Sequence, residues 1–157
     1  MRKKSYCEYV SKYKKDLYIM ANAILNHETD AEDAVSNAIL KGYEKIGQLR
    51  SLQKFRPWML TITKNEALKI KKKRLGLSGN ETVEAMLSPA RDHYDELWDI
   101  LQKMKEEYRL VVVLFYYEEL SLKEISTVLN IPVGTVKSRL SRGKEIIKEA
   151  LEKGGWK

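Results

Sequence analysis

Residues 120–151 carry the sequence LSLKEISTVLNIPVGTVKSRLSRGKEIIKEAL, which contains two amphipathic helical segments separated by a tight turn. Ser121 and Glu124 have the spacing of a capping box, in which the serine oxygen accepts from the glutamate N–H and the glutamate accepts from the serine N–H. The helix that starts there ends before Pro132, which lacks an N–H and suits the first turn of a new helix. This arrangement predicts a helix-turn-helix.

The second helix of this pair has one apolar and one polar face. At 100° per residue its apolar stripe consists of Val136, Leu140, Gly143 and Ile147, and we expect Gly143 to lie where backbones approach closely. Arginine can pair with guanine edges in the major groove, and small serines let a helix sit deep in it. A solvated amphipathic helix is the alternative, but the capped helix and turn before it favour DNA. The candidate DNA-contacting residues are Thr135, Lys137, Ser138, Arg139, Ser141 and Arg142.

The net charge of +7 is unevenly distributed along the 157 residues. Residues 1–74 have 17 Lys/Arg against 8 Asp/Glu, residues 75–107 have 3 against 8, and residues 108–157 have 9 against 6. Two basic ends therefore flank an acidic middle. Basic surfaces attract polyanions, so nucleic acid is the first partner to consider, and an anionic membrane surface is the competing one.

Other function classes find little support in the composition. The longest apolar run, residues 110–117, is far shorter than the roughly 20 residues that cross a bilayer, and no secretion signal follows the basic N-terminus, so we expect a cytoplasmic protein without membrane insertion. Cys7 alone cannot form an internal disulfide, and His27 and His93 are too few for a zinc site. The acidic residues at 30–33 point in different directions on a helix. We therefore expect no metal, no cofactor and no catalytic site.

The helical periodicity predicts an all-α fold of two small domains. Glycine and proline number only 8 and 3. Gly76, Gly79 and Pro89 cluster with serine and asparagine within residues 75–92, which we interpret as a flexible linker between domains at 1–74 and 93–157. The expected helices span about 6–26, 30–46 and 57–74 before the linker, and about 94–105, 107–119, 122–129 and 132–153 after it.

The segment 30–46 predicts a helix with acidic residues in its first turn, where they favour the positive end of the helix dipole. Its apolar stripe comprises Ala31, Val35, Ala38, Ile39, Gly42 and Ile46. The opposite face comprises Asp33, Asn37, Leu40, Lys41 and Glu44. A single exposed leucine is common, but one within a mixed-charge rim has the composition of a protein interface.

The segment from Phe55 to Arg74 begins near Pro57 and ends in a run of basic residues. Its lysines predict a surface that follows phosphates, and Trp58 could stack on an unpaired base. The alternatives are a core position for Trp58 and a solvated helix end for the lysines.

Three motifs in this order resemble the extracytoplasmic-function (ECF) group of bacterial sigma factors: DAEDAVSNAILKGY at 30–43, FRPWMLTITKNEAL at 55–68, and the stretch quoted at 120–151. The resemblance covers nearly the whole chain. It implies a sigma domain 2 and a sigma domain 4, and no catalytic site. It also implies a role in transcription initiation, for example during a stress response.

The resemblance also implies site residues. The β′ clamp helices of core RNA polymerase would be bound by Asp33, Asn37, Leu40, Lys41 and Glu44. The opened minus-10 strand would be held by Arg56, Trp58, Lys64, Asn65, Lys69 and Lys72. The minus-35 element would be recognised by Thr135, Lys137, Ser138, Arg139, Ser141 and Arg142. Lys64 replaces a frequent arginine and Ser141 a larger residue, which leaves the preferred promoter open.

The partners that the resemblance implies are core RNA polymerase, through its β′ clamp helices and β flap, promoter DNA, and an anti-sigma factor that is often membrane-anchored. Each domain would bind DNA weakly alone, and polymerase would make the second contact effectively intramolecular. The alternative is a stand-alone helix-turn-helix regulator with an N-terminal sensing or dimerisation domain. Such a regulator would form dimers on palindromic sites, whereas a sigma factor would be a monomer that co-purifies with polymerase.

Overall fold

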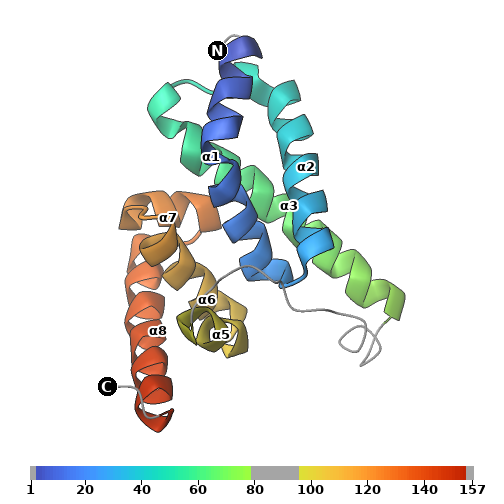
Figure 1. Cartoon of the computed structure of the whole chain (residues 1–157). Coiled ribbons are helices and arrows are strands. Elements are labelled where there is room, and N and C mark those ends of the chain that lie inside the picture. Colours follow the sequence, from blue (N-terminus) through green and yellow to red (C-terminus); the bar gives the residue numbers. More distant parts are fainter. Residues whose placement is uncertain (1–2, 79–95, 155–157) are drawn as a thin grey trace. The chain divides into compact units, whose positions relative to one another are not determined.

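The computed structural model describes residues 3–78 and 96–154, and within these ranges the chain forms helices and turns but no strand (Figure 1). The chain divides into two compact units, residues 1–90 and 91–157. The predicted all-α fold of two small domains is confirmed. The third helix continues to Ser78, into the first residues of the expected linker, and the rest of that linker, 79–92, lies outside the described residues.

The N-terminal domain is a bundle of three helices. They are α1 (Lys3–Leu25), α2 (Glu28–Lys45) and α3 (Phe55–Ser78), and two 3₁₀ turns, η1 (Ile46–Gln48) and η2 (Leu52–Lys54), connect α2 to α3. Each helix packs against both of the others. The largest side chains fully buried between them are Tyr6, Leu17, Met20, Phe55, Met59 and Leu60.

The helix α2 begins two residues earlier than the sequence predicted. His27 is its N-cap, and the Nδ1 atom of His27 accepts a hydrogen bond of 3.2 Å from the backbone N–H of Asp30. Asp30 was expected at the first position but lies in the first turn with Glu28, where both carboxylates favour the helix dipole. Histidine is not a usual capping residue, so the pattern placed the start at the first acidic cluster.

The predicted apolar stripe of α2 faces the other helices. Four of its members, Ala31, Val35, Ala38 and Gly42, are buried, and Ile39 and Ile46 are half-buried. Small side chains let α1 and α3 approach closely. Gly42 shows how closely, because a Cβ atom there would lie 2.5 Å from the Tyr6 hydroxyl and 2.7 Å from the Met59 sulfur.

The C-terminal domain consists of α5 (Glu96–Lys103), α6 (Glu106–Val112), a π-helical turn η3 (Val113–Tyr117), α7 (Leu122–Leu129) and α8 (Val133–Lys153). The sequence predicted one helix over 107–119. Instead, the backbone widens after Val112, and the N–H of Glu118 donates to the carbonyl of Val113, five residues earlier, at 3.0 Å. The wider turn lies within the unbroken apolar run 110–117, whose residues Leu110–Leu114 are all buried.

The helix-turn-helix has the predicted geometry. The capping box is present, with Ser121 N–H to Glu124 Oε1 at 2.9 Å and Glu124 N–H to Ser121 Oγ at 3.1 Å. Asn130 ends α7 in the left-handed conformation at φ 56°. The sequence predicts Pro132 in the first turn of α8. Instead, Pro132 is the N-cap of that helix.

The buried stripe of α8 was predicted almost completely. Val136, Leu140 and Gly143 are buried, while Ile147 is half-buried. Gly143 lies directly against α6, since a Cβ atom there would come within 2.7 Å of the Val112 Cγ2 atom. The glycine therefore lets α8 pack on α6 and fixes which face of α8 points outward.

Candidate functional site

The outward face of α2 contains a large apolar side chain among polar ones. Leu40 is 67 % exposed, and Asp33, Asn37 and Glu44 are exposed around it on the same helix. We call these four residues the α2 face. Residues 33, 37, 40 and 44 are three or four positions apart, so they lie on one side of a helix. Leu40 is thus placed for contact with another macromolecule.

Lys41 differs from its neighbours on α2. Its Nζ atom lies 3.3 Å from the Oε2 atom of Glu66 on α3, and its side chain is half-buried. We had grouped Lys41 with the outward residues, but the nearest carboxylate is on the packed side. The ammonium therefore joins two helices of the domain.

A groove of about 470 Å³ borders the α2 face. An ion pair between Asp30 and Arg74 connects the two helices that form its walls, α2 and α3. Two residues of the α2 face, Asp33 and Asn37, are part of its lining. The complete lining is Asp30, Asp33, Ser36, Asn37, Ile70, Lys73 and Arg74. The α2 face thus continues into a polar groove rather than ending on a flat surface.

Four of the six residues expected at the minus-10 strand share one face of α3. They are Trp58, Asn65, Lys69 and Lys72, at separations of seven, four and three residues along a continuous helix. We call them the α3 face. Asn65, Lys69 and Lys72 are exposed, and Trp58 is half-buried with its ring 6.2 Å from the ring of Phe55. The two interpretations of Trp58, packing and ligand contact, are therefore compatible.

The structure does not bring the other two residues, Arg56 and Lys64, onto this face. Arg56 shares the side of α3 that holds the buried Leu60 and Thr63, and its Nε atom lies 3.7 Å from Oδ2 of Asp16 on α1. Lys64 is half-buried, and burial lowers the pKa of its ammonium. Their grouping with the α3 face followed the sequence order and not the helical positions.

The outward face of α8 presents short polar and long basic side chains. Lys137, Ser138, Ser141 and Arg142 are exposed; we call them the α8 face. Arg142 has a side chain that is 49 % exposed, and its Nη1 atom donates to Oε2 of Glu145 at 3.1 Å. This pair lies in solvent, so the guanidinium can exchange it for a stronger anionic partner.

Thr135 and Arg139 are placed at the edge of the α8 face, because both are half-buried. The Nη2 atom of Arg139 lies 3.7 Å from Oε2 of Glu107 on α6. The ion pair orients Arg139 along the domain surface. Arg142 is therefore the more exposed of the two arginines.

Two buried charges that support these surfaces were missed in the sequence. Glu66 has a side chain only 9 % exposed, and its Oε2 atom receives Lys69 at 3.0 Å as well as Lys41. Arg109 is buried, and its Nη1 atom donates to the carbonyls of Gln102 and Met104, which closes the end of α5. Burial lowers the pKa of Arg109, and nearby Glu106 acts in the opposite direction. The Glu66–Lys69 pair has the local spacing of a helix pair, whereas the Lys41–Glu66 pair and the Arg109 contacts to backbone carbonyls have no such signal.

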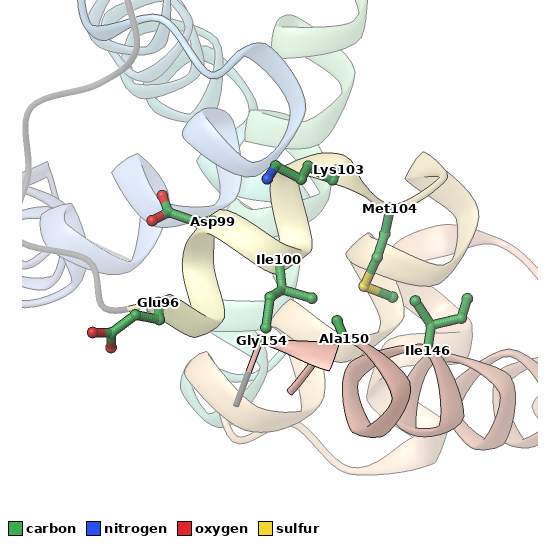
Figure 2. A pocket seen from close by; sticks show the side chains of 8 residues that line it. All are labelled: Glu96, Asp99, Ile100, Lys103, Met104, Ile146, Ala150 and Gly154. Carbon is green, nitrogen blue, oxygen red and sulfur yellow. The ribbon is translucent and has the colours of Figure 1, made fainter. Parts of the chain in front are cut away.

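A second groove lies between α5 and α8 and holds about 360 Å³. Figure 2 shows apolar side chains gathered between the two helices, and carboxylates of α5 at one edge. The apolar lining consists of Ile100, Met104, Ile146 and Ala150, and the remaining lining residues are Glu96, Asp99, Lys103 and Gly154. We had not predicted this groove.

The described ranges 3–78 and 96–154 contain no group of three or more His, Cys, Asp or Glu side chains that could hold a metal ion. Within the same ranges, no helix has the length and hydropathy needed to span a bilayer.

Comparisons with known proteins agree with this division. Residues 9–75 match sigma-70 region 2 and residues 94–147 match sigma-70 region 4. The ECF RNA polymerase sigma factor SigW of Bacillus subtilis is 31% identical over 166 residues, covering 94% of this chain and 89% of SigW. The sigma factor SigV of the same species is 26% identical over 148 residues, covering 92% and 89%.

Two solved structures share the fold. The sigma factor RpoE from Bartonella quintana, crystallised with the anti-sigma factor NepR, has a TM-score of 0.81 at 19% identity and covers 95% of this chain and 98% of its own. CnrH, in complex with the cytosolic domain of CnrY, has a TM-score of 0.73 at 21% identity and covers 96% and 90%.

Two helical domains that match regions 2 and 4, in that order, define a sigma-70-type factor. The chain belongs to the ECF family of RNA polymerase sigma factors. It is an alternative sigma factor of transcription initiation, and the comparisons give no support to a stand-alone regulator.

Proposed function

We propose that the α2 face binds the β′ clamp helices of core RNA polymerase, with Leu40 as its apolar anchor. The exposure of Leu40, at 67 %, carries this assignment, because a large apolar side chain inside a polar rim is the usual composition of a protein contact. Lys41, whose ammonium is paired with Glu66, contributes at the border of this contact. The proposed contact residues are Asp33, Asn37, Leu40, Lys41 and Glu44.

The α3 face captures the opened minus-10 strand. Lysines at one helix face neutralise phosphates, Asn65 can hydrogen-bond a base edge, and Trp58 can stack on an unpaired base. The 3₁₀ turns η1 and η2 lead directly into this helix. Arg56 and Lys64, which lie on other sides of α3, contribute at the borders of the strand.

The α8 face recognises the minus-35 element in the major groove. Arg142 can form two hydrogen bonds to a guanine, worth about 1–3 kcal/mol against a wrong base. The short side chains of Ser138 and Ser141 allow the centre of the face to approach the bases closely. Lys137, Thr135 and Arg139 bind the flanking phosphates.

The groove between α5 and α8 receives the β flap of the polymerase. Its apolar lining fits an apolar segment, and the carboxylates of Glu96 and Asp99 at its edge favour basic flanking residues. In this assignment each domain has one contact with polymerase and one with DNA.

The factor works by binding and has no catalytic site of its own; it acts in the cytoplasm, where polymerase and promoters are found. An anti-sigma factor would keep it inactive by covering the surfaces that polymerase uses. The two solved structures that share the fold are complexes, one with the anti-sigma factor NepR and one with the cytosolic domain of CnrY, which supports this part of the proposal.

The experiment is run-off transcription with core polymerase on a promoter library. We expect transcripts from a subset that shares two sequence elements at a fixed spacing, and no transcripts without the factor. A factor that forms dimers, binds palindromic DNA and does not co-purify with polymerase would contradict the proposal.

A further inference from the structure

A cluster of aromatic rings and cations lies where α1 packs against the start of α3, and of its members only Arg56 was assigned above. The ring of Tyr13 has the Nζ atom of Lys12 at 5.3 Å and the Cζ atom of Arg56 at 6.0 Å from its centre. Both distances are within the range of cation–π contacts. The half-buried ring of Tyr13 therefore has one cation from α1 and one cation from α3 close to it.

Phe55 forms the base of this cluster. It is fully buried, and its ring centre lies 5.2 Å from the ring of Tyr9 and 6.0 Å from that of Tyr13. Tyr9 and Tyr13 are one turn apart, with centres 6.4 Å apart, and both are half-buried. Buried packing therefore fixes two tyrosines side by side while part of each ring remains open to solvent.

Two cations lie at the Tyr13 ring, those of Lys12 and Arg56. Lys54, in the turn before Phe55, is also exposed. Of the carboxylates on this part of α1, Asp16 lies 3.7 Å from Arg56, and Glu8, next to Tyr9, is exposed. The pattern resembles the surfaces on which proteins bind single strands, where rings stack on bases and cations track phosphates.

We infer that Tyr9 and Tyr13, with Lys12 and Arg56, form a second nucleotide site for the unpaired DNA strand, which rests on the minus-10 capture proposed above. The site lies on the α1 side of Phe55, and Trp58 of α3 lies next to the same phenylalanine. Duplex DNA does not fit it, because stacked bases hide their faces. The strand would therefore pass over the start of α3 and contact rings on both helices.

Photochemical cross-linking tests this site without changing the protein. Holoenzyme is assembled from the full chain and core polymerase, and bound to the minus-10 single strand of a promoter selected by run-off transcription. 5-Iodo-deoxyuridine is placed at successive positions of the strand. We expect adducts on Tyr13 or Tyr9 at one or two positions. Adducts on Trp58 and other α3 residues alone would overturn the inference and leave the proposed strand capture intact.

Variants provide the second measurement. Tyr13→Leu removes the ring, and we expect about tenfold weaker binding of the single strand by holoenzyme, since the variant loses the stacking of one base. Tyr13→Phe should restore binding, and Lys12→Gln should lower the salt dependence by about one phosphate contact. Tyr116→Leu, an exposed tyrosine of the other domain, is the matched control.

The results separate this inference from the proposed function. If Asn65→Ala weakens strand binding while Tyr13→Leu does not, strand capture stands and the α1 site is wrong. If Tyr13→Leu instead weakens association with core polymerase, the cluster is a protein contact and the inference is also wrong. If holoenzyme with the wild-type chain, Asn65→Ala or Tyr13→Leu binds the minus-10 strand no more tightly than random single-stranded DNA, both proposals fail.

Discussion

The Oε2 atom of Glu66 lies 3.3 Å from the Nζ atom of Lys41, so one buried carboxylate connects α3 to the helix of the proposed polymerase contact. The same oxygen receives Lys69 of the α3 face at 3.0 Å. Two surfaces with different proposed partners therefore share one internal anion. A change at Glu66 should affect both.

The carboxylate of Glu66 should make the stability of the N-terminal domain depend on pH. Burial opposes ionisation, but hydrogen bonds and charges from Lys69 and Lys41 outweigh it and hold the pKa of Glu66 below its ordinary 4.5. Its ionised form therefore contributes stability above pH 4.5, and this contribution is lost as the pH falls through the lower folded-state pKa. Chemical unfolding at several pH values should show that Glu66→Gln reduces stability at neutral pH and that the difference from wild type shrinks in acid.

Glu44→Gln on the exposed α2 face is the control for that series. It should leave both stability and its pH profile close to wild type, because exposed charges contribute little. A Glu66→Gln variant as stable as wild type at every pH would mean that the carboxylate does not hold the two lysines.

Gly42→Ala should destabilise the N-terminal domain. The added Cβ would lie 2.5 Å from the Tyr6 hydroxyl, which donates to the carbonyl of Ile39 at 2.6 Å, so the substitution must break this bond or separate the helices. Overpacking of this kind costs about 1–3 kcal/mol. Urea denaturation measures it.

Gly76→Ala is the matched substitution on α3, where a Cβ atom would meet nothing within 4 Å. Alanine is the better helix former, so this variant should gain about 0.5–1 kcal/mol. Equal effects of the two substitutions would contradict the close packing at Gly42.

Asn22→Leu should stabilise the N-terminal domain. Asn22 is fully buried in α1, and neither atom of its amide has a hydrogen-bond partner within the described part of the chain. A buried polar group of this kind costs about 1–3 kcal/mol, which an apolar side chain of similar size avoids. Thermal unfolding should show a higher midpoint, and a lower one would reveal a bonding partner of the amide.

Arg142→Ala should weaken minus-35 recognition by about 10- to 100-fold while domain 4 stays folded, because the guanidinium is exposed and its ion pair with Glu145 lies in solvent. Transcription from promoters with altered minus-35 bases measures the loss of selectivity. Lys153→Ala, at the far end of α8, is the control. Unchanged selectivity would place base recognition elsewhere on α8.

Local signals in the sequence were sufficient for several features of the fold. The capping box of Ser121 and Glu124, the outward position of Leu40 and the buried stripe of α8 all depend on spacing within one helix. The start of α2 was wrong by two residues, because the cap is His27. The π-helical turn at 113–117 was missed, because a continuous apolar run has no periodic break to mark it.

Contacts between helices could not be predicted from spacing. Lys41 and Glu66 are 25 residues apart, and their pairing depends on how α2 packs against α3. For the same reason Arg56 was grouped with Trp58 although it faces Asp16 on α1. The sequence thus identified the residue types at each surface, and tertiary packing determined which of them point outward together.

If the chain carries separate surfaces for polymerase and for duplex DNA, a charge at Leu40 should disrupt only the first, and the affinity of Leu40→Asp for core polymerase measures this. Leu40 is 67 % exposed and not part of the buried core, so the variant should fold with a normal helix content and retain the α8 face. We predict that fluorescence anisotropy will show association with core polymerase weakened by at least about 30-fold, the loss of an interface hot spot. An affinity equal to that of wild type would contradict the account.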